Sequence, residues 1–288
     1  MKPSYLISYW YAKQAGKTFN EILDNADRVN LMIDSGAFTA YKCGANITVK
    51  EYIAFCKQIK QYTDKYIMLD VIRSPAKSKD NYKAMLDAGL EPIPIWIEGD
   101  SIEDFRWYYE NSNKYVCISG GRRDRADFLY RCRMAKYTFK DIKIHALAYV
   151  QLPGILKLPI YSADSSTFIS GSKYGRVVEY DYRKKKFNMI ASFIKRNGPS
   201  MELVEAAGKC NTNAKELIQN KQLTVGAKAF SCAYSMNAYL NASSDYARCY
   251  DRYIHLADSG AYWKHLMAVL DSKDGQYFDY KKYRSLLQ

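Results

Sequence analysis

The chain has 288 residues, 48% hydrophobic and 25% charged, which is typical of a folded globular protein and excludes wholesale disorder. No apolar run reaches the ~20 residues that a membrane helix needs, and the N-terminus does not resemble a signal peptide, so we expect a cytoplasmic protein with no membrane partner. A formal net charge of +13 favours a polyanionic partner such as nucleic acid, although a generically basic soluble protein explains a total charge equally well.

The first half of the chain alternates short apolar runs with segments of helical periodicity. Strands are expected over 31–34, 66–69, 93–97, 115–118, 143–150 and 158–161, and helices over 50–62, 80–88, 102–109 and 125–137. Five or six consecutive strand–helix units predict a parallel sheet. We expect a closed (β/α)8 TIM barrel. An open doubly wound sheet is the alternative, but no GxGxxG follows the first strand.

The pattern changes after Asp164. Residues 177–182 and 187–190 predict a β-hairpin around a basic turn, and the chain beyond residue 201 reads as mostly helical, with a long helix over 233–257. No linker, repeat or low-complexity tract marks a second domain. We therefore expect one domain over 1–288, a barrel with a late inserted hairpin and a helical C-terminal region from about residue 200.

Acidic side chains recur where the predicted strands end. Asp34, Asp70, Glu98 and Asp164 hold these positions. A single aspartate there is often only the N-cap of the next helix. On a barrel, however, the carboxyl ends of all strands converge on one mouth, so the four are expected to share a pocket. Two carboxylates can divide the roles of nucleophile and general acid/base, as glycosyl transfer requires.

Glycine and basic residues accompany these acids. Gly120 and Gly121 follow Ser119 and predict either a plain tight turn or a surface of backbone N–H groups for a flat ligand or phosphate. A charge run is usually only a solvated face. Two basic runs on the loops of one face nevertheless predict a nucleic-acid track. Its residues are Arg122, Arg123, Arg125, Lys173, Arg176, Arg183, Lys184, Lys185 and Lys186.

Histidine and cysteine offer little for a metal site. His145 lies within a predicted strand, where a hydrogen-bonded residue of the pocket wall is favoured over a catalytic base. His255 and His265 lie in predicted helix and lack ligand spacing. The seven cysteines are widely spaced, with no CxxC, which favours reduced thiols. No metal and no cofactor are expected.

Taken in order, these motifs resemble the tRNA-guanine transglycosylase superfamily. Asp34-Ser35-Gly36-Ala37-Phe38 is similar to the Asp-Ser-Gly-Gly-Phe strand end of that family, and Glu98-Gly99 stands where the family has Gln-Gly. Gly120-Gly121 resembles the family's Gly-Gly pair. Asp164, after a small-residue strand, is similar to the family's nucleophile, and Gly175-Arg176 to its hairpin. The resemblance covers roughly residues 34–188.

The resemblance implies a mechanism. Asp164 would attack C1′ of a nucleotide and displace guanine, and a 7-deazaguanine such as preQ0 would take its place. Asp34 would act as general acid/base and Asp70 would hold the Watson–Crick edge of the base. The wider base pocket would include Ser35, Phe38, Glu98, Gly120, Gly121 and His145.

Departures from the family pattern bear on the substrate. The family's CxCxxC zinc motif is absent, the chain is short, and no RNA-binding appendix is recognisable. These traits resemble the compact DNA-directed branch found in phages and DNA-modification clusters, which would place the protein in a host cytoplasm. The resemblance thus implies exchange in DNA. The alternatives are the same exchange in tRNA, an inactive barrel that binds nucleic acid, and a glycoside hydrolase that uses Asp34 and Asp164.

Overall fold

The computed structural model describes residues 2–119, 125–149, 154–169, 176–192, 207–208, 210, 218–219, 222–223 and 225–288. The chain divides into two compact units. Unit 1 comprises Met1–Ser165 and Cys249–Ala261, and unit 2 comprises Ser166–Arg248 and Tyr262–Gln288.

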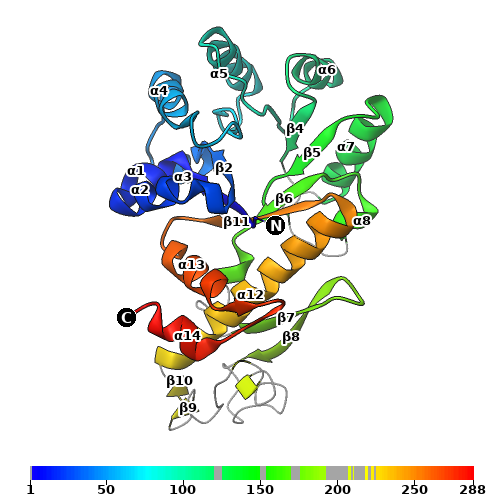
Figure 1. The fold of residues 1–288 in the computed structure, drawn as a ribbon. Coiled ribbons are helices and arrows are strands. Elements are labelled where there is room, and N and C mark those ends of the chain that lie inside the picture. Colours follow the sequence, from blue (N-terminus) through cyan, green and yellow to red (C-terminus); the bar gives the residue numbers. More distant parts are fainter. Residues whose placement is uncertain are drawn as a thin grey trace. The chain divides into compact units, whose positions relative to one another are not determined.

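Unit 1 is an α/β structure around a curled, parallel, seven-stranded sheet (Figure 1). The strand order is β2-β1-β11-β6-β5-β4-β3. The strands are β1 (Ser4–Ser8), β2 (Asn30–Asp34), β3 (Ile95–Trp96), β4 (Tyr115–Ile118), β5 (Lys143–Ala146), β6 (Ser162–Ser165) and β11 (Tyr253–Asp258). The prediction of a parallel sheet is confirmed, and the carboxyl ends of these strands share one edge because all paired neighbours run parallel.

A further extended segment, residues 66–68, makes backbone contacts in two directions. Ile67 N donates to Ile33 O at 2.8 Å, beside β2. Met68 N donates to Ile93 O at 2.9 Å, just before β3. Parallel bridges accompany these bonds between Ile33 and Tyr66 and between Ile67 and Ile93. The segment therefore lies between β2 and the residues that lead into β3.

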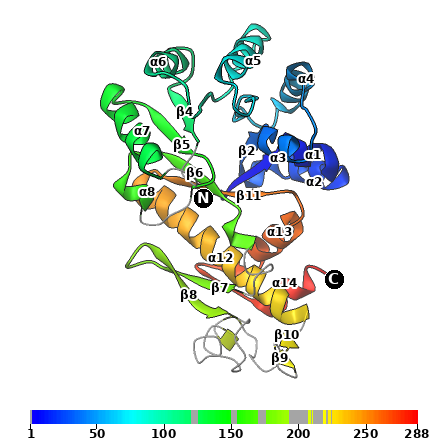
Figure 2. The ribbon, with the colours of Figure 1, turned by 180° about the vertical axis from the view of Figure 1, so that it is seen from behind.

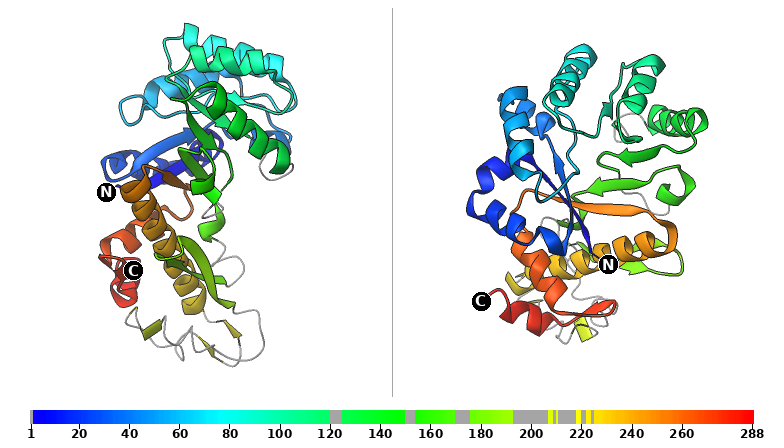
Figure 3. Two further views of the ribbon diagram at one scale, coloured as in Figure 1. Left: turned by 90° about the vertical axis from the view of Figure 1, so that its right-hand side faces the viewer. Right: turned by 45° about the horizontal axis from the view of Figure 1, so that its top comes forward.

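Helices lie on the outer side of this sheet (Figure 3). They are α1 (Tyr9–Ala15), α2 (Lys17–Asp24), α3 (Ala37–Lys42), α4 (Val49–Ile59), α5 (Pro75–Asp87), α6 (Ile102–Glu110), α7 (Arg125–Thr138) and α8 (Gly154–Lys157), with a 3-10 turn η1 (Ala26–Arg28). The four helices predicted in this part of the chain are confirmed to within a few residues. The largest difference is α5, which starts at Pro75 because proline suits the first turn of a helix.

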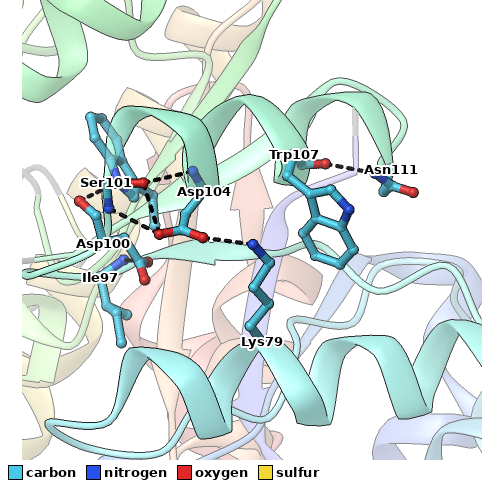
Figure 4. Close-up of polar contacts among 8 residues, drawn as sticks. Lys79, Ile97, Asp100, Ser101, Asp104, Trp107 and Asn111 are labelled. Carbon is cyan, nitrogen blue, oxygen red and sulfur yellow. Dashed lines mark hydrogen bonds and ion pairs between the residues drawn. The ribbon is translucent and has the colours of Figure 1, made fainter.

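The loop after β3 is held by the start of α6 (Figure 4). Ser101 Oγ accepts from Asp104 N at 3.0 Å, and Asp104 Oδ2 accepts from Ser101 N at 3.1 Å, which forms a capping box. Asp104 also accepts from Lys79 of α5 at 2.6 Å, and Asp100 accepts from Ile97 N at 2.9 Å. These bonds turn the chain sharply between β3 and α6.

The long helix predicted over 233–257 is wrong at its C-terminal end. Helix α12 (Val225–Tyr250) stops before Asp251, which has a positive φ of 51° that a helix cannot continue through. Strand β11 follows and pairs with β1 on one side and β6 on the other. A short apolar run cannot be assigned to helix or strand by periodicity alone, and here burial between two strands decided it.

Unit 2 contains the predicted hairpin. Strands β7 (Arg176–Asp181) and β8 (Lys186–Ser192) are antiparallel and lie alongside α12 (Figure 2). Tyr180 donates to Asp245 of α12 at 2.6 Å, and Tyr234 of α12 donates to Glu179 at 3.0 Å. The other elements of unit 2 are η2 (Thr167–Ile169), β9 (Ile218–Gln219), β10 (Gln222–Leu223), α13 (Trp263–Asp271), β12 (Lys273–Asp274), β13 (Tyr277–Phe278) and α14 (Tyr280–Ser285). Over the described residues, no helix has the length and apolar character needed to span a membrane.

Candidate active site

Three of the predicted acids lie at the carboxyl ends of strands in unit 1. Asp34 ends β2, Asp70 follows the segment 66–68, and Asp164 belongs to β6. Burial raises the pKa of Asp34 to about 7, and the nearby charges of Asp70 and Asp164 contribute to this shift. Burial also raises the pKa of Asp70 to about 6. The three carboxyl groups therefore share one poorly solvated place, and Asp34 can gain or lose a proton near neutral pH.

Hydrogen bonds at the strand end orient Asp34 and Asp70. Gly36 N donates to Asp34 Oδ2 at 2.9 Å, and Ser35 Oγ donates to Asp70 Oδ1 at 3.3 Å. Ser35 is 1% exposed. It therefore acts on the site through Asp70, because its hydroxyl is covered by protein.

Gly36 allows the chain to turn immediately after Asp34 and Ser35. Its φ is 75°, in the left-handed region that side chains disfavour. A Cβ at this position would lie 2.6 Å from Trp10 Cβ and 3.0 Å from Ser8 Oγ. Both the backbone conformation and the available space therefore require glycine between Ser35 and Ala37.

Asp164 is held by donors from β5 and the loop that follows it. Its Oδ1 accepts from Ala148 N at 2.8 Å and faces His145 Nε2 at 3.3 Å. Ala148 has a φ of 53°, an uncommon conformation for a non-glycine residue and one that often occurs at functional sites. The His145 ring is fully buried and its Nδ1 is 2.6 Å from Ser162 Oγ.

Ser162, His145 and Asp164 have the composition of a hydrolase triad but not its arrangement. In such a triad the serine faces His Nε2 and the carboxylate faces Nδ1. Here the order is reversed, and Ser162 is fully buried with Tyr115 OH 2.5 Å from its Oγ. Ser162 therefore cannot meet a substrate, and Asp164 is the member of the group at the strand end.

Cys117 of β4 is a further side chain that lies close to the three carboxylates. It lies opposite His145 in the register of β4 and β5 and is fully buried. Burial raises the pKa of its thiol well above the usual range, and the charges of Asp34, Asp164 and Asp70 raise it further. The thiol thus stays protonated and unreactive. All three carboxylates act on this one side chain, which is a second sign that they converge.

The other described residues of the predicted base pocket differ in their surroundings. Glu98 is exposed in the turn after β3, and within the described part of the chain it makes no hydrogen bond or ion pair. Phe38 is 49% exposed in the first turn of α3, with Lys42 Nζ 4.3 Å from its ring centroid. His145 lies in the buried sheet and contacts Asp164, so both of its nitrogens already have neighbours.

Gly120 and Gly121 of the predicted base pocket fall outside the described residues. So does much of the predicted nucleic-acid track: Arg122, Arg123 and Lys173, together with the side chains of Arg125 and Arg176. The turn of the β7–β8 hairpin is described. Arg183, Lys184 and Lys186 are exposed there, whereas Lys185 pairs with Asp245 at 2.5 Å. Three of the four cations over residues 183–186 are therefore available to solvent.

Sequence reasoning did not single out Arg131 of α7. Its guanidinium is buried and donates to the carbonyl oxygens of Trp96, at 3.0 Å, and Ser119. It also pairs with Asp127 at 2.7 Å. Arg131 thus ties together the carboxyl ends of β3 and β4. Asp127 and Arg131 lie four residues apart on a predicted helix, which was the available signal.

The carboxylate of Asp258, at the end of β11, was also missed. Asp258-Ser259-Gly260-Ala261 repeats the Asp34-Ser35-Gly36-Ala37 sequence, and it likewise ends a parallel strand. Asp258 accepts from Tyr5 OH at 3.0 Å and from Ser259 N at 2.7 Å. The four-residue repeat itself was the signal.

Comparison with models of known protein families, with characterised proteins and with solved structures finds no match for this chain. Among the described residues, no group of three or more histidine, cysteine, aspartate or glutamate side chains is arranged to hold a metal ion. The features of this chain that bear on function are therefore its converging carboxylates.

Proposed function

We propose that this protein is a base-exchange transglycosylase that replaces guanine in DNA with a 7-deazaguanine such as preQ0, through a covalent bond to Asp164. One observation carries the proposal: Asp34, Asp70 and Asp164 converge at the carboxyl ends of parallel strands, and their proximity and burial raise the pKa of Asp34 to about 7. Glycosyl exchange needs both a nucleophilic carboxylate and a second carboxyl group that can carry a proton.

In the first step, Asp164 attacks C1′ of the nucleotide and forms a C1′–O bond. The C1′–N9 bond breaks, its electron pair moves to the guanine, and the Asp34 carboxyl donates a proton so that guanine leaves as a neutral base. A pKa of about 7 leaves a large share of Asp34 protonated at neutral pH, as this step requires. Asp70 accepts hydrogen bonds from the Watson–Crick edge of the base.

In the second step, the incoming 7-deazaguanine gives its N9 proton to the Asp34 carboxylate. N9 then attacks C1′ and the C1′–O bond to Asp164 breaks. Asp34 is again protonated and Asp164 again charged, so the exchange consumes no other reagent. Splitting the reaction into two displacements lowers the barrier of each.

We also propose that the sheet of unit 1 closes into an eight-stranded (β/α)8 barrel, with residues 66–69 as its third strand. The supporting evidence is that Ile67 bonds to β2 and Met68 bonds to Ile93, so the segment can link the two edges of the seven-stranded sheet. In a barrel of this kind the carboxyl-end loops form the catalytic face, which is where Asp34, Asp70 and Asp164 lie.

DNA is the proposed polymer. The net charge of +13 and the exposed Arg183, Lys184 and Lys186 suit a phosphate backbone. C1′ of a base-paired nucleotide is inaccessible to a buried aspartate, so the target nucleotide must be flipped out of the duplex.

The test combines labelled guanine with either duplex DNA or tRNA, followed by a denaturing gel and mass spectrometry of the protein. We expect exchange into DNA and a covalent adduct on Asp164 that Asp164→Asn abolishes. Asp141→Asn is the matched control, because Asp141 is exposed, precedes β5 at the opposite end of the strand and pairs with Lys114. Label in tRNA alone would overturn the DNA assignment. Binding without exchange or adduct would identify an inactive nucleic-acid-binding protein.

A further inference from the structure

We infer that His145 is a positioning residue for Asp164: together with Ala148 N it holds Oδ1, so that Oδ2 is the oxygen that attacks C1′. Ser162 and Tyr115 set the tautomer of His145 that this requires. The inference rests on the proposed function and assigns roles to a buried row of side chains that the two-step reaction does not otherwise use.

The two oxygens of Asp164 have different surroundings. Oδ1 accepts from Ala148 N at 2.8 Å and has His145 Nε2 at 3.3 Å. No hydrogen bond from any described residue reaches Oδ2. Asp164 as a whole is 8% exposed, so a small part of its surface remains open to a substrate. The carboxylate is thus held through one oxygen while its other oxygen is free to form a bond.

The inferred tautomer of His145 requires one direction for the hydrogen bonds along this row. Burial raises the pKa of Tyr115 well above the usual range, so its hydroxyl keeps a proton that it can donate to Ser162 Oγ, 2.5 Å away. In the inferred arrangement Tyr115 is the donor of this bond. The Ser162 hydroxyl then donates to His145 Nδ1 at 2.6 Å. In this arrangement Nδ1 of His145 is an acceptor, and the ring proton lies on Nε2, where it donates to Asp164 Oδ1.

Register explains why these groups meet. His145 lies opposite Ser162 in the pairing of β5 with β6, and Cys117 lies opposite His145 in the pairing of β4 with β5. Tyr115 and Cys117 are two residues apart on β4 and therefore face the same side of the sheet. Buried polar groups of this kind are stabilising only when each has a partner, and the row from Tyr115 to Asp164 is connected throughout.

His255 provides a matched comparison on the same sheet. It pairs with Asp164 in the register of β11 and β6, is 1% exposed, and its ring centroid is 5.7 Å from that of His145. Its Nδ1 has no hydrogen-bond partner among the described residues. His255 is thus an equally buried imidazole close to the site that does not hold the Asp164 carboxylate.

The kinetic test measures the single-turnover rate of adduct formation on Asp164. His145→Phe is expected to lower this rate about 100-fold with little change in DNA affinity, because small misplacements of a nucleophile are costly. His145→Gln, which keeps an N–H donor, is expected to recover roughly a tenth or more of the parent rate. His255→Phe is the control and is expected to stay within about 3-fold of the parent. Equal losses in His145→Phe and His255→Phe would overturn the inference.

A second measurement does not depend on activity. Because the chain has only three histidines, the imidazole ¹⁵N spectrum of the parent, assigned with His145→Gln, reports the tautomer of His145 directly. We expect the proton on Nε2, and we expect Ser162→Ala to disturb that preference. A proton on Nδ1 would overturn the inference even if exchange occurs. The expected tautomer in a protein that forms no adduct would instead refute the proposed function and leave His145 as the residue that orients Asp164.

Discussion

Two stretches of unit 1 share the sequence Asp-Ser-Gly-Ala but place their aspartates in different surroundings. Asp34 ends β2 and Asp258 ends β11, and both strands pair with β1. The glycines of both stretches have positive φ angles, 75° at Gly36 and 86° at Gly260. The same four residues thus make the same kind of sharp turn after a parallel strand.

Register separates the two aspartates. Asp34 lies opposite Ser8 of β1, whereas Asp258 lies opposite the preceding residue, Ile7. Because side chains alternate along a strand, an offset of one residue places the two carboxylates on opposite faces of the sheet. Asp34 joins Asp70 and Asp164, and Asp258 bonds to Tyr5 instead. The motif therefore specifies a turn, and register specifies what its carboxylate can do.

The largest expected difference between the two stretches is in activity. Asp34→Asn should lower the rate of adduct formation on Asp164 about 1,000-fold, because the leaving guanine loses its proton donor. Asp258→Asn should leave the rate of the folded protein within about 3-fold, since its carboxylate faces away from the site. Single-turnover kinetics with duplex DNA measures both. A comparable loss of rate in both variants would show that the face of the sheet on which each carboxylate lies does not decide its role.

The two aspartates should also differ in their effect on stability. The pKa of Asp34 is near its ordinary value of 3.8 in the unfolded state and about 7 in the folded state. At a pH between these two values, the unfolded state therefore binds fewer protons than the folded state. The free energy of unfolding contributed by Asp34 therefore falls as the pH rises from about 4 to 7. Asp34→Asn should remove this loss and be more stable than the parent at pH 8 by roughly 2–3 kcal/mol, but not at pH 4.

Asp258→Asn should instead be less stable than the parent, because it weakens the buried hydrogen bond from Tyr5. The free energy of unfolding should fall by about 1–2 kcal/mol. Urea unfolding of the parent and both variants at pH 4 and pH 8 measures the two effects. A destabilised Asp34→Asn at pH 8 would contradict a raised pKa of Asp34 in the folded protein.

The two glycines offer a smaller contrast. A Cβ at Gly36 would lie 2.6 Å from Trp10 Cβ, whereas a Cβ at Gly260 would lie 3.4 Å from Ala15 Cβ. Both alanine variants incur the strain of a positive φ, about 1 kcal/mol. Gly36→Ala adds a clash and should cost about 2 kcal/mol more than Gly260→Ala. Thermal unfolding compares them, and equal losses would mean that φ alone requires glycine at both positions.

The smallest expected effect is a shift in pH dependence. If protonated Asp34 donates to guanine, adduct formation should slow as the pH rises above about 7. Asp70→Asn removes one charge that raises the pKa of Asp34, so the same decline should begin at lower pH, by less than about one pH unit. The pH profile of single-turnover rates measures this. A shift to higher pH would mean that Asp70 does not raise the pKa of Asp34.

Local sequence was sufficient for the features that depend on neighbouring residues. A helix was expected over 102–109, and α6 begins at Ile102, where Ser101 and Asp104 form a capping box. The apolar runs that stop at Asp34 and Asp70 predicted parallel strands with acids at one edge, because buried strands leave their polar residues at the ends. The same reasoning placed Glu98 in the pocket, but the turn held by Asp100 and Ser101 leaves it exposed.

The sequence by itself determined a parallel α/β sheet, the positions of four helices in its first half and a set of acids where strands end, since these follow from periodicity and from strands that run in one direction. Only the tertiary structure decided that residues 253–258 form a central strand, that His145 lies against Asp164 and Ser162, and that Asp34 rather than Asp258 joins the carboxylates. These outcomes depend on strand register, in which a shift of one residue moves a side chain to the other face, and short-range sequence carries no record of it.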